Sequence, residues 1–250
     1  MSAPAPVLTA TLAQTEMELR LTARRGENVL VTIVIPVVVL LFFASVDVLR
    51  AGDGPPVDFL LPGALALAIM ATSLVNLGIA TAYERYYGVL KRLGGSPLTR
   101  GGLLAAKTGA VLAVEIAQVV LLLAIAIVLL DWRPGAGASP ALFVVALLLG
   151  TLAFAGLGLL LAGTLRAEAT LALANGLFIG FLLLGGIVLP VSDLPGPLAA
   201  LAGVLPAAAL ADAFRVALGS SDADPAPSLV ILAVWGVAAI VLAVRTFRWE

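Results

Sequence analysis

The sequence has no cysteine and no histidine, and only 12% of its 250 residues are charged. The first two absences exclude disulfides, thiol nucleophiles, Cys/His zinc sites and histidine general bases. A soluble domain carries about 25% charged residues, so this chain has too few polar side chains to cover a water-facing surface. The formal net charge of −1 argues against a nucleic-acid-binding protein. With 62% hydrophobic residues, the composition predicts an integral membrane protein that binds no nucleic acid and no metal.

What the sequence has in place of charge is long apolar runs, each close to the roughly 20 residues that cross a bilayer as a helix. The runs cover residues 29–46, 59–82, 103–130, 141–165, 169–189 and 228–244. They are continuous and do not alternate with a period of two, which favours helices over strands. The sequence therefore predicts an all-α membrane protein with six transmembrane helices.

The basic residues are unevenly distributed along this pattern. Eleven of the 14 lie in the N-terminal segment, between the second and third runs, or after the fourth and sixth runs. The opposite loops keep only Arg50, Arg133 and Arg215, together with eight aspartates. Because positive residues accumulate on the cytoplasmic side, this distribution predicts that both termini are cytoplasmic.

The N-terminal segment has the pattern of a surface helix. Leu8, Leu12, Thr15 and Leu19 recur at helical spacing, and most of the charges lie off that stripe. We expect residues 8–27 to form an amphipathic helix along the inner membrane surface, with a partly ordered soluble tail as the alternative. The predicted organisation is thus residues 1–28 as tail and interfacial helix, and residues 29–250 as the six-span domain.

The loop at residues 84–100, between the second and third runs, combines positive charge with apolar side chains. Its first ten residues suit a helix that Gly94 and Gly95 end, and Ser96-Pro97 can start the next helix. The apolar side chains at helical spacing are those of Tyr86, Val89, Leu90 and Leu93. The segment is either a docking surface for a partner or a basic loop that fixes topology against lipid headgroups.

A second unusual segment, residues 190–219, lies on the other side between the fifth and sixth runs. It predicts two short apolar helices, 198–205 and 206–218, bounded by prolines and too short to span. We expect them to dip into the outer leaflet as a re-entrant element or to cap the spans. Asp212 and Arg215 are three residues apart and either form an ion pair or are separately solvated.

These two segments together resemble ABC-2-type transporter permeases, the membrane subunits of bacterial ABC exporters. In the cytoplasmic loop the matching residues are Glu84, Gly88, Leu93, Pro97, Leu98 and Arg100, followed by Lys107. In the outer segment they are Pro190, Ser192, Leu194, Pro195, Pro206, Asp212, Ala213 and Arg215. The order and spacing of the two motifs are more specific than either motif alone.

The resemblance implies half of a transporter in the bacterial cytoplasmic (inner) membrane. Similar permeases pair with a second permease subunit, as homodimers or heterodimers, and bind two ATP-binding-cassette ATPase subunits, which hold the ATP and Mg. Residues 84–100 would then form the coupling segment. The candidate coupling residues are Glu84, Arg85, Gly88, Leu90, Lys91, Arg92, Leu93, Pro97, Leu98 and Arg100. The chain itself is expected to bind no cofactor and to be no enzyme, because its nearest phosphate-loop match, residues 101–108, lacks the second glycine.

Polar residues inside the runs mark a candidate substrate pathway. Asn76, Glu115 and Asn175 each lie seven or eight residues from a charge at the inner boundary, which places them roughly 10–12 Å deep. Gln118 shares a helix face with Glu115. We predict a polar layer of these four residues, which either contacts a polar or cationic part of a substrate or provides hydrogen bonds between helices.

Gly176 and Gly180 form a G-x-x-x-G motif in the fifth run, a pattern typical of close helix packing. The partner helix lies either within the chain or, alternatively, in a second subunit.

The predicted function is export of hydrophobic drugs or lipid-like substrates, as in multidrug efflux and antibiotic resistance, because the spans offer few charges. An alternative within the class is export of a cell-envelope polymer or a role in cytochrome assembly. Alternatives outside it are an intramembrane prenyltransferase-type enzyme and a secondary carrier. The former normally needs aspartate clusters, and the latter broken helices with ionisable residues near the midplane.

Overall fold

The computed structural model describes residues 6–24, 26–45, 55–95 and 98–248, and of residues 26–31 the backbone only. Within these ranges the chain is all-helical and contains no strand, which confirms the predicted fold class. Apolar runs of this kind become helices because a helix satisfies its own backbone hydrogen bonds where no water is present.

The described helical segments form in chain order as follows. They are α1 (Val7–Arg24), α2 (Gly26–Ser45), α3 (Pro56–Ile69), the π-helical segment η1 (Met70–Asn76), α4 (Leu77–Tyr86), α5 (Val89–Gly94), α6 (Arg100–Leu129), α7 (Pro140–Thr164), α8 (Ala167–Leu184), the 3₁₀ turn η2 (Val191–Asp193), α9 (Gly196–Ala202), α10 (Pro206–Ala217) and α11 (Ala226–Thr246).

Five helices of the described chain are long and apolar enough to cross a membrane. They are α6, α7, α8, α11 and the continuous helix Pro56–Tyr86, which comprises α3, η1 and α4. The second to sixth predicted spans are therefore present as helices. The first predicted span falls on α2, which continues through Pro36, but its described apolar part, Thr32–Ser45, is shorter than the other five. Its role as a span stays a prediction.

The predicted outer segment forms two short helices, as expected. α9 and α10 meet at a bend of 75° after a short break. The fifth span is shorter than predicted, because α8 ends at Leu184 and Gly186 takes a left-handed backbone conformation with φ of 62°. The chain there leaves the helix axis before it reaches the prolines of the outer segment.

α7 is the helix against which most of the bundle packs, and glycines allow its close contacts. A Cβ at Gly158 would lie 2.7 Å from the carbonyl oxygen of Ser73 in η1. One at Gly156 would lie 2.8 Å from the Cβ of Ala239 in α11. These two glycines therefore bring the backbones of η1 and α11 directly against α7.

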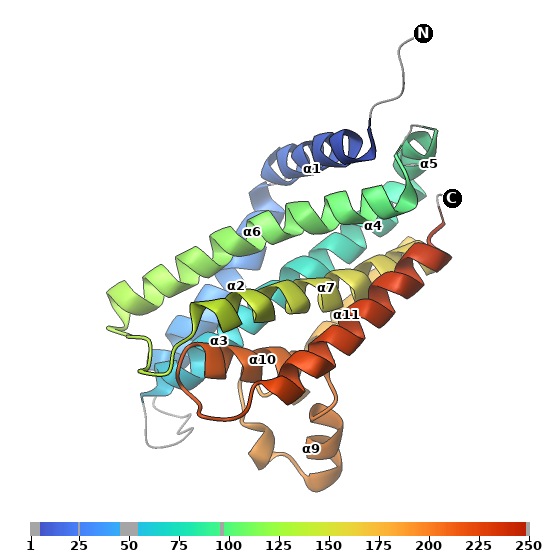
Figure 1. Ribbon diagram of the computed structural model, residues 1–250. Helices are drawn as coiled ribbons and strands as arrows, with labels where there is room; N and C mark the ends of the chain where they lie inside the picture. The colour runs from blue at the N-terminus through green and yellow to red at the C-terminus, as the bar shows by residue number, and fades with distance from the viewer. Residues whose placement is uncertain (1–5, 25, 46–54, 96–97, 249–250) are drawn as a thin grey trace.

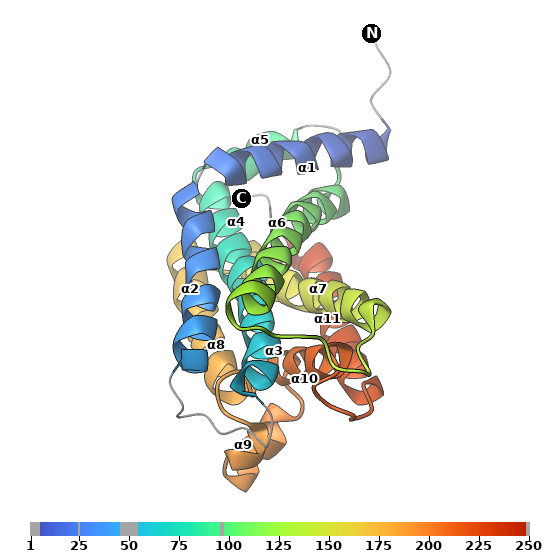
Figure 2. The ribbon, with the colours of Figure 1, turned by 90° about the vertical axis from the view of Figure 1, so that its left-hand side faces the viewer.

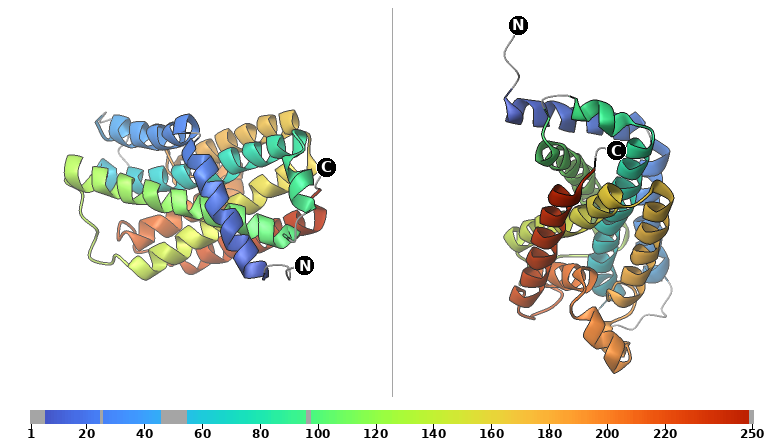
Figure 3. Two further views of the ribbon diagram at one scale, coloured as in Figure 1. Left: turned by 90° about the horizontal axis from the view of Figure 1, so that it is seen from above. Right: turned by 90° about the vertical axis from the view of Figure 1, so that its right-hand side faces the viewer.

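The bundle has two distinct ends. α1 and α5 lie at one end, together with the C-terminal end of α11, whereas α9 lies at the other end (Figures 1 and 2). From above, α1 crosses the ends of the bundle diagonally over α6 (Figure 3). Of the basic residues predicted to share one side, those that the structure describes are thus gathered at the α1 and α5 end.

α1 confirms a helix in the N-terminal segment, although it ends at Arg24, before residue 27. Its inner face packs against α6, where Thr11 and Thr15 lie beside Gly102 and Gly109. Leu8 and Leu12 point away from the protein and are exposed. The helix has an apolar edge free for lipid, so its position along the membrane surface stays a prediction.

Candidate functional site

The loop at residues 84–100 contains two helices where the sequence predicted one. α4 runs to Tyr86, Gly88 takes a left-handed conformation with φ of 72°, and α5 begins at Val89. The expectation of a single helix over residues 84–93 is therefore wrong, because a positive φ, which glycine adopts readily, interrupts helical geometry. α5 ends at Gly94, as the glycine pair predicted. α6 begins at Arg100, with Thr99 as N-cap; Ser96 and Pro97 lie outside the described residues.

Some of the candidate coupling residues are buried and anchor the segment to α6, whereas others are exposed. Leu90 and Leu98 are buried in a cluster with Leu103 and Leu104 of α6. Leu90 is therefore not part of a docking surface, contrary to the prediction, and Leu93 is partly buried beside it. The exposed members of the segment form the α5 surface, which we define as Tyr86, Tyr87, Val89, Lys91, Arg92 and, at the start of α6, Arg100.

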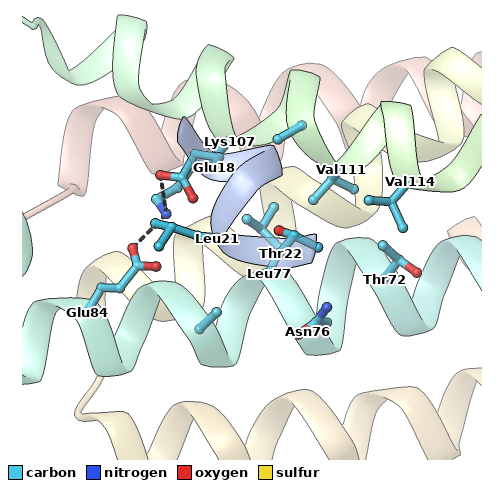
Figure 4. A pocket seen from close by; sticks show the side chains of 12 residues that line it. Glu18, Leu21, Thr22, Thr72, Asn76, Leu77, Glu84, Lys107, Val111 and Val114 are labelled. Atoms are coloured by element: carbon cyan, nitrogen blue, oxygen red, sulfur yellow. Dashed lines mark hydrogen bonds and ion pairs between the residues drawn. The ribbon is translucent and has the colours of Figure 1, made fainter. Parts of the chain in front are cut away.

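Beneath this surface Lys107 connects three helices through ion pairs (Figure 4). Its side chain is only 1% exposed, and its Nζ lies 2.6 Å from Oε2 of Glu84 in α4 and 2.9 Å from Oε1 of Glu18 in α1. Gln14 donates a further hydrogen bond to Glu18. Glu84 is thus 11% exposed and acts inside the protein. We call Glu18, Glu84 and Lys107 the lysine network.

The lysine network closes one side of a small cavity of about 50 Å³ between α1, η1, α4 and α6. Thr22, Thr72 and Asn76 also line it, among apolar side chains (Figure 4). A volume of this size has room for water. The cavity therefore brings polar groups from the α1 and α5 end down to the level of η1.

Other basic side chains surround the same end of the bundle. Arg85 donates a hydrogen bond to the carbonyl oxygen of Leu165, which ties α4 to the end of α7. A cavity of about 480 Å³ is lined by Arg85, Lys91 and Arg166, and another of about 390 Å³ by Arg100, Arg245 and Arg248. The end that carries the α5 surface is therefore strongly positive.

The predicted polar layer divides into two separate groups. Glu115 and Gln118 of α6 are buried and face η1. Glu115 hydrogen bonds with the hydroxyls of Ser73 and Thr151. Gln118 accepts a hydrogen bond from Thr72 at 3.0 Å and donates one to the carbonyl oxygen of Thr32 at 3.2 Å. The partners of both residues are thus hydroxyls and a backbone carbonyl, and neither Asn76 nor Asn175 is among them.

Asn76 and Asn175 lie instead on a different cavity, of about 300 Å³, which we call the α8 cavity. Its lining residues are Thr32, Ile35, Ala71, Val75, Asn76, Ile79, Asn175 and Phe178. Glu115 and Gln118 therefore share no hydrogen bond with Asn76 or Asn175, and the role of the four residues as a substrate pathway stays a prediction. Within η1, Thr72 and Ser73 hydrogen bond with α6 and Ala71 and Val75 face α8, whereas Asn76 lines both this cavity and the small cavity against α6.

Four further members of these groups were not predicted from the sequence: Thr32, Thr72, Ser73 and Thr151. The signal was present for two of them, because Thr72 and Ser73 precede Asn76 by about one helical turn. No spacing in the sequence relates them to Glu115 or to Thr151. Only the packing of η1 between α6 and α7 brings the hydroxyls of Ser73 and Thr151 to the carboxyl of Glu115.

The G-x-x-x-G motif makes no close contact within the described chain. A Cβ at Gly176 or at Gly180 would meet no atom within 4 Å. Packing of this motif against another helix of the same chain is therefore wrong. The alternative, a contact with a second subunit, stays a prediction.

At the outer end Arg215 holds the cap of the bundle together. Its guanidinium lies 2.6 Å from Oδ1 of Asp212, donates to the carbonyl oxygen of Gly186 and lies 4.3 Å from the centre of the Phe59 ring. The ion pair considered from the sequence is therefore present. It positions α10 against α3 and the turn after α8.

One comparison with known proteins gives a match over most of the chain. The model of a family described as ABC-2 type transporter matches residues 9–218. This range extends from α1 to the end of α10 and includes both residues 84–100 and residues 190–218. A comparison with curated proteins found no match.

Proposed function

This chain belongs to the ABC-2 type transporter family, and we propose that it is the permease subunit of an ATP-driven exporter in a bacterial cytoplasmic membrane. The family match carries this proposal, because it covers the coupling segment, the spans and the outer cap in one continuous range. The chain is thus a multi-pass transport protein and not an enzyme. Membership of this family decides against a prenyltransferase and a secondary carrier.

We place the partner ATPase subunits, two per transporter, on the α5 surface. Tyr86 and Tyr87 are 65% and 69% exposed, and Lys91 and Arg92 are exposed beside them. Exposed aromatic and arginine side chains are the residue types that dominate protein interfaces. The buried anchors Leu90 and Leu98 fix this surface to α6, so that a force applied at α5 moves the spans. ATP and Mg would be held by those partners.

The α8 cavity is the proposed substrate contact. Its lining is apolar except for Thr32 and the amides of Asn76 and Asn175, and it includes no charged residue. Such a surface suits hydrophobic drugs or lipid-like molecules. Its volume of about 300 Å³ is at the lower end for a ligand pocket, so a second permease subunit across α8 would complete it. Gly176 and Gly180, whose surroundings are open, lie on the same helix.

Reversal of charge on the α5 surface tests the proposed partner. We expect Lys91→Glu with Arg92→Glu to reduce co-purification with an identified ABC ATPase at least about tenfold, because like-charge contacts replace complementary ones. The fold should be retained, since both side chains are exposed. The matched control is Arg133→Glu, an exposed charge reversal at the opposite end. Equal binding by the double variant and the control would disprove docking at α5.

A reconstituted complex with its ATPase tests the substrate class. A panel of hydrophobic compounds should stimulate ATP hydrolysis, and Phe178→Ala should raise the half-stimulating concentration roughly three- to tenfold through the loss of one apolar contact. The control Ile179→Ala removes an exposed side chain of the same helix that does not line the cavity. Stimulation only by polymer or haem-related substrates would favour the envelope-polymer or cytochrome-assembly alternative.

A further inference from the structure

Glu115 is a fully buried acid in the middle of α6, between η1 and α7. Its Oε1 hydrogen bonds with Oγ of Ser73, and its Oε2 with Oγ1 of Thr151. It does not line the α8 cavity. Glu115 therefore contacts protein hydroxyls and is out of reach of a molecule in that cavity.

No positive charge compensates this carboxyl within the described residues, because every ion pair there involves other acids. The nearest basic residue along α6 toward the cytoplasm is Lys107, eight residues or about 12 Å away. Lys107 is already engaged with Glu18 and Glu84. A carboxylate at this position would be a buried, unpaired charge, which is strongly unfavourable.

The hydrogen bonds of Thr151 identify where a proton fits. Its Oγ1 lies within hydrogen-bond distance of Oε2 of Glu115 and 2.8 Å from the carbonyl oxygen of Leu147. A hydroxyl has one hydrogen and cannot donate fully to both acceptors. If the carboxyl is protonated, its O–H donates to Thr151, Thr151 donates to Leu147, and Ser73 donates to the remaining carboxyl oxygen. All three side chains are then satisfied without a buried charge.

We propose that Glu115 is an intramembrane proton-binding site, a neutral carboxylic acid that joins η1 to α6 and α7 and so positions the wall of the α8 cavity. Ser73, which Glu115 holds, is in the same π-helical segment as Ala71, Val75 and Asn76, which line that cavity. π-helical segments are rare and are frequently found at functional sites. Glu115 is thus a positioning residue. The importance of this positioning for transport rests on the proposed function, whereas the protonation does not.

Infrared spectroscopy tests the protonation directly on the purified full chain in lipid nanodiscs. The difference spectrum between the unmodified chain and Glu115→Gln should contain the carbonyl stretch of a protonated carboxylic acid at neutral pH. The matched control, Glu84→Gln, removes an ion-paired carboxylate and should change only carboxylate bands. A carboxylate band in place of the acid band for Glu115 would overturn the proposal.

Rescue by the isosteric amide tests the hydrogen-bond arrangement. Glutamine keeps a donor toward Thr151 and an acceptor for Ser73, so Glu115→Gln should melt within about 2 °C of the unmodified chain. Glu115→Ala leaves both hydroxyls without this partner and should melt about 5 °C lower. If Glu115→Gln is as unstable as Glu115→Ala, the side chain is not a neutral donor and the proposal fails.

A single introduced cysteine tests the positioning role, because the chain has no cysteine of its own. The rate at which Asn76→Cys reacts with a membrane-permeant maleimide is first measured with Glu115 unchanged. Addition of Glu115→Gln should leave this rate unchanged, whereas addition of Glu115→Ala should change it at least threefold. Ile179→Cys, on the exposed face of α8, should show no such change. Equal rates in all backgrounds would contradict positioning of η1. These readouts need no transport. Failure of the unmodified chain to couple to an ATPase or to export a substrate would therefore contradict only the proposed function.

Discussion

Lys107 shows how a single side chain can determine the architecture of the α1 and α5 end of the bundle. It is a buried cation that is neutralised by two carboxylates, one from α1 and one from α4. Among the described ion pairs, neither carboxylate has another basic partner. The sequence motif identified Glu84 as important but gave no indication that its partner is Lys107, 23 residues away. Glu18, from the N-terminal helix, had no predicted partner.

We predict that Lys107→Met destabilises the chain by about 3 kcal/mol, because Glu18 and Glu84 would remain close together without a cation. Thermal melting of the purified chain measures this change. Arg20→Met is the control, since Arg20 pairs with Glu16 on the exposed face of α1 and should cost less than about 1 kcal/mol. Addition of Glu18→Gln and Glu84→Gln to Lys107→Met should recover part of the loss. A melting temperature unchanged by Lys107→Met would show that the lysine network has no structural role.

At the scale of the helix, the G-x-x-x-G motif does not mark the glycines that allow close packing. The motif of Gly176 and Gly180 faces open space in the described chain, whereas Gly156 and Gly158 of α7, which match no packing motif of that spacing, lie directly against α11 and η1. The number of residues between two glycines therefore did not reveal which helix is packed. What decides it is the direction in which each glycine faces after the helices have assembled.

Gly158→Ala should destabilise the chain by about 1–3 kcal/mol, because its Cβ would lie 2.7 Å from the carbonyl oxygen of Ser73 and force α7 away from η1. Gly176→Ala should leave the melting temperature of the single chain unchanged or slightly raised, since a Cβ there meets nothing. If α8 forms the subunit contact, the second variant should still reduce cross-linked dimer in membranes. Equal destabilisation by both variants would contradict the packing of α7 described above.

Across the whole molecule, the two ends of the bundle differ in the sign of their charged side chains. Arginines and lysines surround the α1 and α5 end, whereas the opposite end has Asp212 paired with Arg215 and Asp58 bonded to Trp132. This separation agrees with the arrangement expected from the sequence. It supports cytoplasmic termini, because positive residues are retained on that side of the membrane.

Single cysteines at the two ends test this orientation. In intact cells a membrane-impermeant maleimide should label Ser221→Cys, whereas Arg92→Cys should be labelled only after the cells are permeabilised. Arg92 is exposed and Ser221 is partly exposed, and the unmodified chain provides a background without cysteine. Leu122→Cys, buried in α6, should remain unlabelled in both conditions. The reverse pattern would invert the proposed topology.

The sequence by itself determined the membrane class, the positions of five spans, the separation of charge and the two family motifs. These properties follow from residue composition along a continuous stretch, and a helix in a bilayer needs little more to form. The tertiary structure decided that Gly88 divides the coupling segment, that η1 separates Glu115 from Asn175, and that Lys107 joins α1 to α4. Each of these depends on a backbone conformation or on the rotation of one helix against another, and residues far apart in sequence carry no local signal of it.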